Sequence, residues 1–326
     1  MNILLTGGAG YIGSHVALNL LDQGHEVTII DSLVNSDGKL IPPEAKFIKS
    51  DIADEKIISK IFVNKKYDVV MHFAGFTRVG ESVKFPEKYI LNNYEKAKTF
   101  FNICIENNIK KAIFSSTGSI YGNLKQNINI SESVKPNPTN PYSESKFKLE
   151  NFLIKKSDEK LLDTIILRYF NVAGSDEKMR SGLLSNPDNL IKAVCEVATY
   201  KKKKFTVNGN KYNTKDGTAI RDLIHVSDLA EMHLLAAKKI IKKNGFEIYN
   251  CGYGMGYSIE DVIKEMNNLI GRKINYEYGP NREGDVEYSV SDNTKFKKNF
   301  KWEPKHNNLN YILKTALNWE KSISNK

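Results

Sequence analysis

The stretch ILLTGGAGYIG, residues 3–13, decides the fold of this 326-residue chain. Its apolar start predicts a buried strand, and Gly7, Gly10 and Gly13 form a G-x-x-G-x-x-G turn directly before the first helical pattern. Glycine permits a tight turn, the close approach of the backbone to a pyrophosphate, and the packing of helix on strand. The N–H groups at a helix N-terminus also favour phosphate. The sequence therefore predicts a dinucleotide-binding turn, with a purely structural turn as the alternative.

The acidic residue Asp31 ends the second apolar run, 18 residues after Gly13. In dinucleotide-binding folds an acidic residue about 20 residues beyond the glycines binds the ribose diol of the adenosine half. Its charge repels a 2′-phosphate, so the sequence favours NAD over NADP. The alternative is a carboxylate that only caps its own turn.

Short apolar, β-rich runs alternate with helical patterns through the first half of the chain. Buried strands are predicted at 3–5, 26–30, 46–48, 68–73, 111–114 and 164–169, and helices at 12–23, 55–64, 86–107 and 141–156. This alternation predicts an α/β fold, a Rossmann-type doubly wound parallel sheet. The alternation ends after about Val172, which predicts a second, smaller lobe of mixed α/β structure. We expect residues 1–172 and 219–243 in the first lobe, and residues 173–218 and 244–326 in the second.

Tyr142 and Lys146 lie four residues apart, behind an Asn140-Pro141 pair that predicts a helix N-cap and first helical residue. Residues i and i+4 share one helix face, about 5–6 Å apart. A free tyrosine has a pKa of about 10. A fixed positive charge nearby lowers that pKa, and the helix dipole adds to the effect. Tyr142 would then be a general base for a hydroxyl; the alternative is a chance spacing on a surface helix.

The bulk composition is that of a globular protein with a basic surface. Hydrophobic content of 40% and charged content of 26% are ordinary values for that class. The net charge of +10 is spread over many segments, and its densest run is only residues 201–204, which we interpret as a solvated face. No nucleic-acid-reading motif accompanies the charge, so we expect no nucleic-acid partner.

Cys104, Cys195 and Cys251 are far apart in the sequence and odd in number. They form no C-x-x-C pair, which argues against a disulfide scaffold or a metal site and favours reduced thiols. No apolar run approaches the ~20 residues of a membrane span, and no signal peptide precedes the first strand. We therefore expect a soluble, cytoplasmic protein with no membrane partner.

With these residues together, the chain resembles the extended short-chain dehydrogenase/reductase superfamily and, within it, the UDP-glucose 4-epimerase family. The resemblance covers nearly the whole chain. It rests on residues 7–15 (GGAGYIGSH), 73–75 (FAG), 140–142 (NPY) with Lys146, 167–174 (LRYFNVAG), 216–218 (DGT) with 221–222 (RD), and 282–285 (REGD). The stretches in the second half are more specific than the glycines.

The resemblance implies NAD as cofactor, a UDP-sugar as substrate, and no metal, so the two lobes become an NAD-binding domain and a nucleotide-sugar-binding domain. The implied cofactor contacts are Gly7, Gly10, Tyr11, Ile12, Gly13, Asp31, Asn35, Ser36, Asp51, Ile52, Phe73, Ala74, Gly75, Asn92, Ser115, Tyr142, Lys146 and Phe170. The implied substrate contacts are Thr117, Tyr142, Asn171, Asn189, Leu190, Arg221, Arg282, Asp285 and Ser289. Two arginines suit a diphosphate because a guanidinium forms forked bonds to phosphate oxygens; the alternative for each is a surface salt bridge.

The implied reaction is NAD-dependent 4-epimerisation, an isomerase step of galactose metabolism that interconverts UDP-glucose and UDP-galactose through a 4-keto intermediate. Thr117 would hydrogen-bond the sugar O4, Tyr142 would remove its proton, and Lys146 would lower the tyrosine pKa. Ser289 stands where family members restricted to plain hexoses tend to carry tyrosine, so UDP-N-acetylglucosamine and UDP-N-acetylgalactosamine are possible further substrates, although neighbouring Tyr288 could fill the gap.

Other readings of the sequence stay open at this stage. A 4,6-dehydratase typically has Asp-Glu after the threonine, where this chain has Gly118-Ser119. A decarboxylase acting on a UDP-sugar and a catalytically inactive NAD-binding regulatory protein are the remaining alternatives. Thr77 replaces a lysine that the family often carries, and neighbouring Arg78 either supplies that charge or faces solvent. The resemblance also suggests a homodimer formed through the helices at 86–107 and 141–156.

Overall fold

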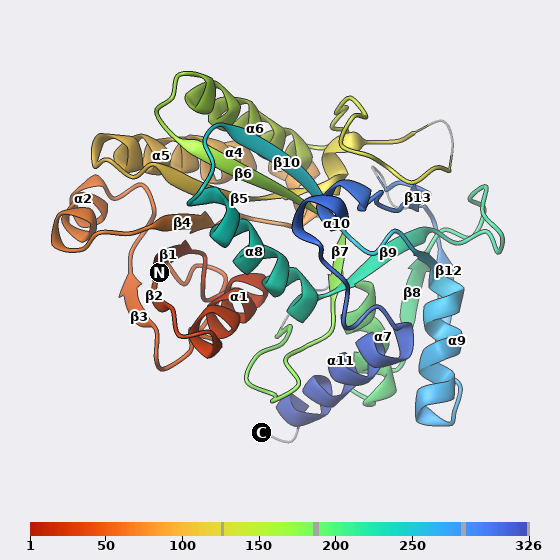
Figure 1. The fold of residues 1–326 in the computed structure, drawn as a ribbon. Helices are drawn as coiled ribbons and strands as arrows, with labels where there is room; N and C mark the ends of the chain where they lie inside the picture. Colours follow the sequence, from red (N-terminus) through yellow and green to blue (C-terminus); the bar gives the residue numbers. More distant parts are fainter. Residues whose placement is uncertain (125–126, 185–188, 282–284, 325–326) are drawn as a thin grey trace. The chain divides into compact units, whose positions relative to one another are not determined.

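The computed structural model describes residues 1–124, 127–184, 189–281 and 285–324. The chain, whose fold is drawn in Figure 1, divides into two compact units. Unit 1 comprises Met1–Ile120, Pro138–Arg168 and Ala230–Tyr249. Unit 2 comprises Tyr121–Asn137, Tyr169–Leu229 and Asn250–Lys326.

This division differs from the two predicted lobes. Residues 121–137, 169–172 and 219–229 belong to unit 2, and residues 244–249 belong to unit 1. The chain passes between the units inside continuous elements, among them β10 (Phe246–Cys251) and α8 (Val226–Ile240). No change of composition marks a boundary inside a helix or strand, which is why the sequence placed the boundaries elsewhere.

Unit 1 is built on the parallel sheet that the sequence predicts. Among the described residues, seven strands form this sheet in the order β10-β6-β5-β4-β1-β2-β3. Their bounds are β1 Asn2–Thr6, β2 Glu26–Asp31, β3 Lys46–Lys49, β4 Val69–His72, β5 Lys111–Thr117 and β6 Asp163–Tyr169, with β10 as above. β1 pairs in parallel with both β2 and β4, so the order of strands reverses at β1. The Rossmann-type prediction is confirmed, and in such sheets ligands bind where the order reverses.

Helices cover the sheet of unit 1. They are α1 (Tyr11–Asp22), α2 (Glu55–Asn64), α3 (Val79–Lys84), α4 (Pro86–Ile90), the π-turn η1 (Leu91–Glu95), α5 (Lys96–Glu106) and α6 (Pro141–Asp158), with the 3₁₀ turn η2 (Gly118–Tyr121) after β5. The predicted helix 86–107 is therefore three consecutive helical pieces. Its middle turn is wider than an α-helix, a feature often found at functional sites.

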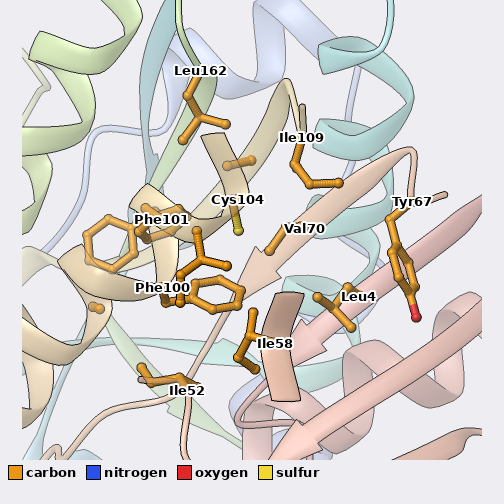
Figure 2. Packing of buried hydrophobic residues seen from close by; sticks show 14 of the residues in the cluster. Leu4, Ile52, Ile58, Tyr67, Val70, Phe100, Phe101, Cys104, Ile109 and Leu162 are labelled. Atoms are coloured by element: carbon orange, nitrogen blue, oxygen red, sulfur yellow. The ribbon is translucent and has the colours of Figure 1, made fainter. Parts of the chain in front are cut away.

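The core of unit 1 forms where α2 and α5 pack on the central strands, as Figure 2 shows. Leu4 of β1 and Val70 of β4 meet Ile58 of α2 and Phe100 of α5, and all four side chains are fully buried. Alternate residues of a strand point to opposite faces, so Ile3 and Leu5 are buried on the other side of the sheet.

Unit 2 contains a smaller mixed sheet. In the described part of the chain, β7 (Asn171–Ala173), β9 (Ile220–His225), β11 (Gly256–Ser258) and β13 (Tyr288–Ser289) form it. β9 pairs in parallel with β7 and β13 and antiparallel with β11, while β8 (Phe205–Asn208) pairs separately with β12 (Tyr276–Gly279). The helices are α7 (Leu190–Ala198), α9 (Ile259–Ile270), α10 (Thr294–Phe300) and α11 (Leu309–Ser324). The predicted mixed α/β lobe is confirmed.

No helix in the ranges that the structure describes has both the length and the hydropathy needed to cross a bilayer.

Candidate active site

The three glycines of the first turn meet different surroundings. Gly7 has φ +73°, and a Cβ on it would lie 2.4 Å from the Ala74 nitrogen. A Cβ on Gly13 would lie 2.4 Å from the Gly7 carbonyl oxygen. A Cβ on Gly10 would approach nothing closer than that same oxygen, at 3.4 Å. Packing within the protein therefore requires Gly7 and Gly13, whereas Gly10 leaves a space that a bound group can enter.

The N-terminus of α1 begins at this space. Gly10 is the N-cap and carries no side-chain cap, and no acidic residue stands in the first turn, which starts with Tyr11 and Ile12. The first N–H groups of a helix have no partner within the helix and form the positive end of its dipole. A pyrophosphate fits this combination of an open glycine and an uncapped helix start, so the turn suits NAD.

Asp31, at the end of β2, lies against the same turn. Its carboxylate accepts hydrogen bonds from the Ala9 nitrogen at 3.1 Å and the Leu33 nitrogen at 2.9 Å. Burial raises the pKa of Asp31, and the two amide donors oppose that rise. Ser36 donates from its hydroxyl to the Ala9 carbonyl at 2.9 Å, while Asn35 is exposed. The structure thus brings Asp31 and Ser36 to the glycine turn, and Asp31 also holds the local backbone, as the capping alternative expects.

Asp51 and Ile52, the residues assigned to the adenine, follow β3. The Asp51 carboxylate pairs with the Lys96 ammonium and accepts from the Ala53 nitrogen at 2.9 Å. Burial raises the pKa of Asp51, but Lys96 and the amide outweigh it, so the net pKa is lowered. Ile52 is buried in the core beside α2 and α5. The ion pair fixes this segment to α5.

The segment after β4, which carries Phe73, Ala74 and Gly75, lies beside Lys146. A Cβ on Gly75 would come within 3.3 Å of the Asn93 side-chain oxygen and 3.4 Å of the Lys146 nitrogen. The Phe73 ring centre lies 5.0 Å from that of His233. The structure therefore brings this predicted cofactor segment next to the predicted catalytic lysine.

Asn93 is a buried polar residue of this region that the sequence analysis missed. Its amide accepts from the Phe76 nitrogen at 2.8 Å and donates to the Phe76 carbonyl at 2.9 Å and the Ser145 hydroxyl at 3.3 Å. Asn92, the predicted contact, donates to the Asn93 side-chain oxygen at 3.1 Å. An Asn-Asn pair inside a helical pattern is the signal that could have found it, because asparagine competes with the backbone for hydrogen bonds.

Thr117 and Tyr142 come together at the end of β5 and the start of α6. Asn140 begins α6 with a capping box, in which its side chain accepts from the Ser143 nitrogen at 2.9 Å. This cap places Tyr142 in the first turn, where its hydroxyl is hydrogen-bonded to Thr117. Thr117 also accepts from the Ser119 nitrogen at 3.1 Å, which fixes its side chain.

The predicted lowering of the Tyr142 pKa is wrong for the protein by itself. Burial raises the pKa of Tyr142, and the hydrogen bond from Thr117 opposes that rise without overcoming it. The spacing along the helix gave the shared face correctly, but it could not show that removal of the half-buried phenol from water outweighs the hydrogen bond. The buried Tyr89 ring packs edge-on against Tyr142 with centres 6.5 Å apart, and its hydroxyl donates to Glu81 at 2.9 Å.

Lys146 lies one turn after Tyr142 and is only 3% exposed. Its ammonium donates to the Ser115 carbonyl at 3.0 Å and lies 5.0 Å from the centre of the Phe114 ring. Burial lowers the pKa of Lys146 to about 8, and the Glu150 carboxylate opposes that fall. The amine is therefore mostly charged at neutral pH and is held by the same strand end that carries Thr117.

Arg221 in unit 2, one of the two predicted diphosphate ligands, pairs with Asp285, another predicted substrate contact. The guanidinium lies 2.5 Å from the Asp285 carboxylate and donates to the Ile220 carbonyl at 2.9 Å. Its side chain is 11% exposed, so this is a largely buried pair rather than a surface salt bridge. Arg282, the second predicted arginine, lies outside the described residues.

The remaining predicted substrate residues of unit 2 stand at the starts of elements. Asn189 is the N-cap of α7, and its side chain accepts from the Lys192 nitrogen at 2.9 Å. Leu190 is the first residue of that helix, and Asn171 is exposed at the start of β7. Phe170, predicted for the cofactor, is buried in unit 2 rather than in unit 1.

Ser289 lies on β13 directly beside Arg221 of β9. Its neighbour Tyr288 donates from its hydroxyl to the Asn129 side chain at 2.9 Å. Successive residues of a strand point to opposite faces, so the Tyr288 ring and the Ser289 side chain point in opposite directions. The Tyr288 ring therefore does not lie on the face of β13 that carries Ser289. Thr77 and Arg78 are both exposed, so Arg78 faces solvent.

The comparisons with known proteins agree with this geometry. The NAD dependent epimerase/dehydratase family matches residues 3–252. A UDP-glucose 4-epimerase of Lactobacillus helveticus is 38% identical over 323 residues, covering 99% of this chain and 98% of that protein. The structure of the Bifidobacterium longum UDP-glucose 4-epimerase in complex with NAD⁺ and UDP is 34% identical, with a TM-score of 0.94, covering 100% of this chain and 99% of that chain.

A third relative has a name that includes two sugars. The structure of the UDP-Glc/GlcNAc 4-epimerase of Campylobacter jejuni is 36% identical, with a TM-score of 0.84, covering 98% of this chain and 99% of that chain. The glycine turn and the cluster of Thr117, Tyr142 and Lys146 agree with these matches, which extend along nearly the full length of the chain. The chain belongs to the NAD dependent epimerase/dehydratase family and, within it, to the UDP-glucose 4-epimerase family.

Proposed function

We propose that this chain interconverts UDP-glucose and UDP-galactose by inverting C4 through a 4-keto intermediate, as a step of galactose metabolism. The observation that carries the proposal is the hydrogen bond between Thr117 and Tyr142, with Lys146 one turn further along α6. The same unit contains the open Gly10 turn and Asp31. A hydroxyl relay, a phenol and an amine beside a dinucleotide turn suit oxidation of a sugar alcohol.

Each side chain of the cluster has a distinct role. In the complex, the positive charges of Lys146 and of bound NAD⁺ favour the Tyr142 phenolate and offset the burial that raises its pKa. The phenolate takes the proton from the sugar O4 and later returns it, and the Thr117 hydroxyl orients that proton. Lys146 supplies the nearby positive charge and a donor for a ribose hydroxyl. Bound NAD⁺ would supply the redox chemistry at C4, as hydride acceptor and, once reduced, as hydride donor. Gly7, Gly10 and Gly13, with Asp31, hold the dinucleotide in unit 1.

The UDP moiety is held by polar side chains of unit 2. Arg221 is already fixed by Asp285 and by its own neighbouring carbonyl, so its remaining N–H groups are oriented before a diphosphate binds. We assign Arg282, Asn171, Asn189 and Leu190 to the same moiety. Binding through the nucleotide leaves the sugar free to turn, which inversion at C4 requires.

Ser289 extends the range of sugars to UDP-N-acetylglucosamine and UDP-N-acetylgalactosamine. The serine side chain is small, and the ring of Tyr288 is held away by Asn129. An acetamido group can therefore lie where a tyrosine ring would obstruct it. The Campylobacter jejuni relative, whose name includes GlcNAc, supports this extension.

The protein acts as a homodimer in the cytoplasm. The helices proposed for the interface expose apolar side chains, since Phe85 is 56% and Leu91 57% exposed beside α4. Such residues favour a protein partner, here a second copy. Cys104, Cys195 and Cys251 are buried and none of them forms a disulfide, which suits a reducing compartment. Light scattering of the purified protein tests the dimer.

Turnover of UDP-galactose without added cofactor tests the function. The purified protein is incubated with each of the four UDP-sugars, and the products are separated by chromatography and weighed by mass spectrometry. Interconversion at C4 with unchanged mass is expected. Loss of water would indicate a dehydratase instead, although Gly118-Ser119 offers no carboxylate for that step. No product even after NAD is added would contradict the proposal.

A further inference from the structure

The last three residues of β5 are each tied to a different residue of α6. The Ser115 carbonyl accepts from the Lys146 ammonium at 3.0 Å, and Thr117 is hydrogen-bonded to Tyr142. Between them, the Ser116 hydroxyl donates to the Glu150 carboxylate at 2.5 Å. The three helix residues are spaced by four and so share one face of α6. Two of the three ties belong to the proposed catalytic cluster, and Glu150 makes the third.

The side chain of Glu150 has no exposed surface. Besides Ser116 it binds Arg168 of β6 through two hydrogen bonds, at 2.6 Å and 3.1 Å. Arg168 is 3% exposed, so both charges are withdrawn from water. A buried ion pair is seldom the most stable filling for a core, because apolar residues of similar volume do as well or better. Packing alone therefore does not account for a carboxylate at this position, which suggests a role in the function of the protein.

The groups around Lys146 make Glu150 its counter-charge. On α6, Lys146 shares one face with Tyr142 and Glu150. Its charge interacts electrostatically with Glu150 and with His72 of β4, and Arg168 of β6 pairs with Glu150. Burial and Lys146 itself lower the pKa of His72 well below its usual value, so His72 is neutral. In the protein by itself Tyr142 carries no charge at neutral pH, since burial raises its pKa. Glu150 supplies the negative charge in this set.

We propose that Glu150 is a positioning residue of the reaction: through Ser116 it holds the strand end that carries Thr117, and one turn along the same face of α6 it is the carboxylate that accompanies the Lys146 ammonium. This inference rests on the proposed function for its catalytic meaning. Burial of Lys146 away from water lowers its pKa, and the Glu150 carboxylate raises it.

Removal of the carboxylate charge tests the inference. Glu150→Gln keeps a partner for Ser116 but leaves Arg168 buried without an anion, so the double variant Glu150→Gln/Arg168→Gln is made as well. In the native protein, the activity that needs charged Lys146 is lost as the pH rises through about 8. Without Glu150 the ammonium loses its proton earlier, and this alkaline limb of kcat moves to lower pH by at least about 1 unit.

The charge of Lys146 is also measured directly. Lysine side-chain carbon resonances are followed against pH in isotope-labelled protein, and the Lys146 signal is assigned by its absence in Lys146→Met. The matched control is Asp163→Asn, which breaks the half-buried Lys111–Asp163 pair (2.9 Å) at the other end of β5. That control is expected to lower the melting temperature and to leave the alkaline limb and the Lys146 titration in place.

The outcomes separate this inference from the proposed function. An inactive native protein would contradict the proposed function, while the Lys146 titration would still report on Glu150. A double variant that is folded and active, with an unmoved alkaline limb and an unmoved Lys146 titration, would overturn the inference. A double variant that loses only stability, as the control does, would also overturn the inference. A purely structural role lowers the melting temperature without shifting the pH dependence.

Discussion

Removal of the Tyr142 hydroxyl should slow the reaction strongly and leave NAD bound. Tyr142→Phe keeps the ring that packs against Tyr89 but removes the proton acceptor and the bond to Thr117. We expect kcat to fall by about 10²–10⁴-fold, the usual contribution of a general base. NAD released from the denatured variant, measured by absorbance, should equal that of the native protein. Near-normal epimerisation would refute the role of Tyr142.

Gly10 and Gly13 should respond to the same substitution in opposite ways. Gly10→Ala places its Cβ at an ordinary contact distance, so stability should change by less than about 0.5 kcal/mol while NAD content falls. Gly13→Ala drives its Cβ into the Gly7 carbonyl and should cost about 1–3 kcal/mol. Thermal melting and cofactor content are measured for both. If Gly10→Ala bound NAD fully, the assignment of the open space to the pyrophosphate would be wrong.

At the scale of the element, the cap of α6 should matter for catalysis as well as for stability. Asn140→Ala removes the capping box and should cost about 1 kcal/mol. It also loosens the turn that holds Tyr142, so kcat should fall. Asp54→Ala is the matched control, since Asp54 caps α2 in the same way, by accepting from the Ile57 nitrogen. The control should lose similar stability in urea denaturation with unchanged kcat, and equal kcat values in both variants would contradict the link.

Much of the element order could be predicted from the sequence because buried parallel strands are continuous apolar runs. β1, β2, β3, β4, β5 and β6 all lie where such runs occur. The helix predicted at 86–107 is interrupted by the π-turn η1, which periodicity over a long window cannot reveal. The helix containing Tyr142 and Lys146 was predicted with its correct first residue, because Asn140-Pro141 is a strong local signal.

The site was harder to predict where burial and long-range partners decide the chemistry. The four-residue spacing predicted that Tyr142 and Lys146 share a face, but burial sets the direction of both pKa shifts. In the sequence, Glu150 cannot be told apart from any other helical glutamate. Its partners Ser116 and Arg168 belong to two different strands and reach it only after folding. The pairing of Arg221 with Asp285, 64 residues apart, is likewise visible only after folding.

For the whole molecule, the division into two units predicts that one unit can lose stability by itself. In unit 2, Glu320 of α11 is 1% exposed and lies 2.6 Å from both Lys192 of α7 and Lys201. Glu320→Gln leaves the buried Lys192 ammonium without its anion, and breaking such a pair costs about 3–5 kcal/mol. Hydrogen exchange should therefore speed up in α7 and α11 while β1 and β4 of unit 1 stay protected.

The control for this experiment is Glu159→Gln, which removes the exposed partner of Lys156 in unit 1 (2.8 Å). An exposed pair contributes about 0–1 kcal/mol, so exchange in both units should stay close to that of the native protein. Faster exchange in β1 and β4 of Glu320→Gln, equal to that in α7 and α11, would show that the chain opens as one cooperative unit. Protection that persists in β1 and β4 instead means that the nucleotide turn and the Tyr142 cluster stay folded when α11 is loosened, so cofactor content should survive in this variant.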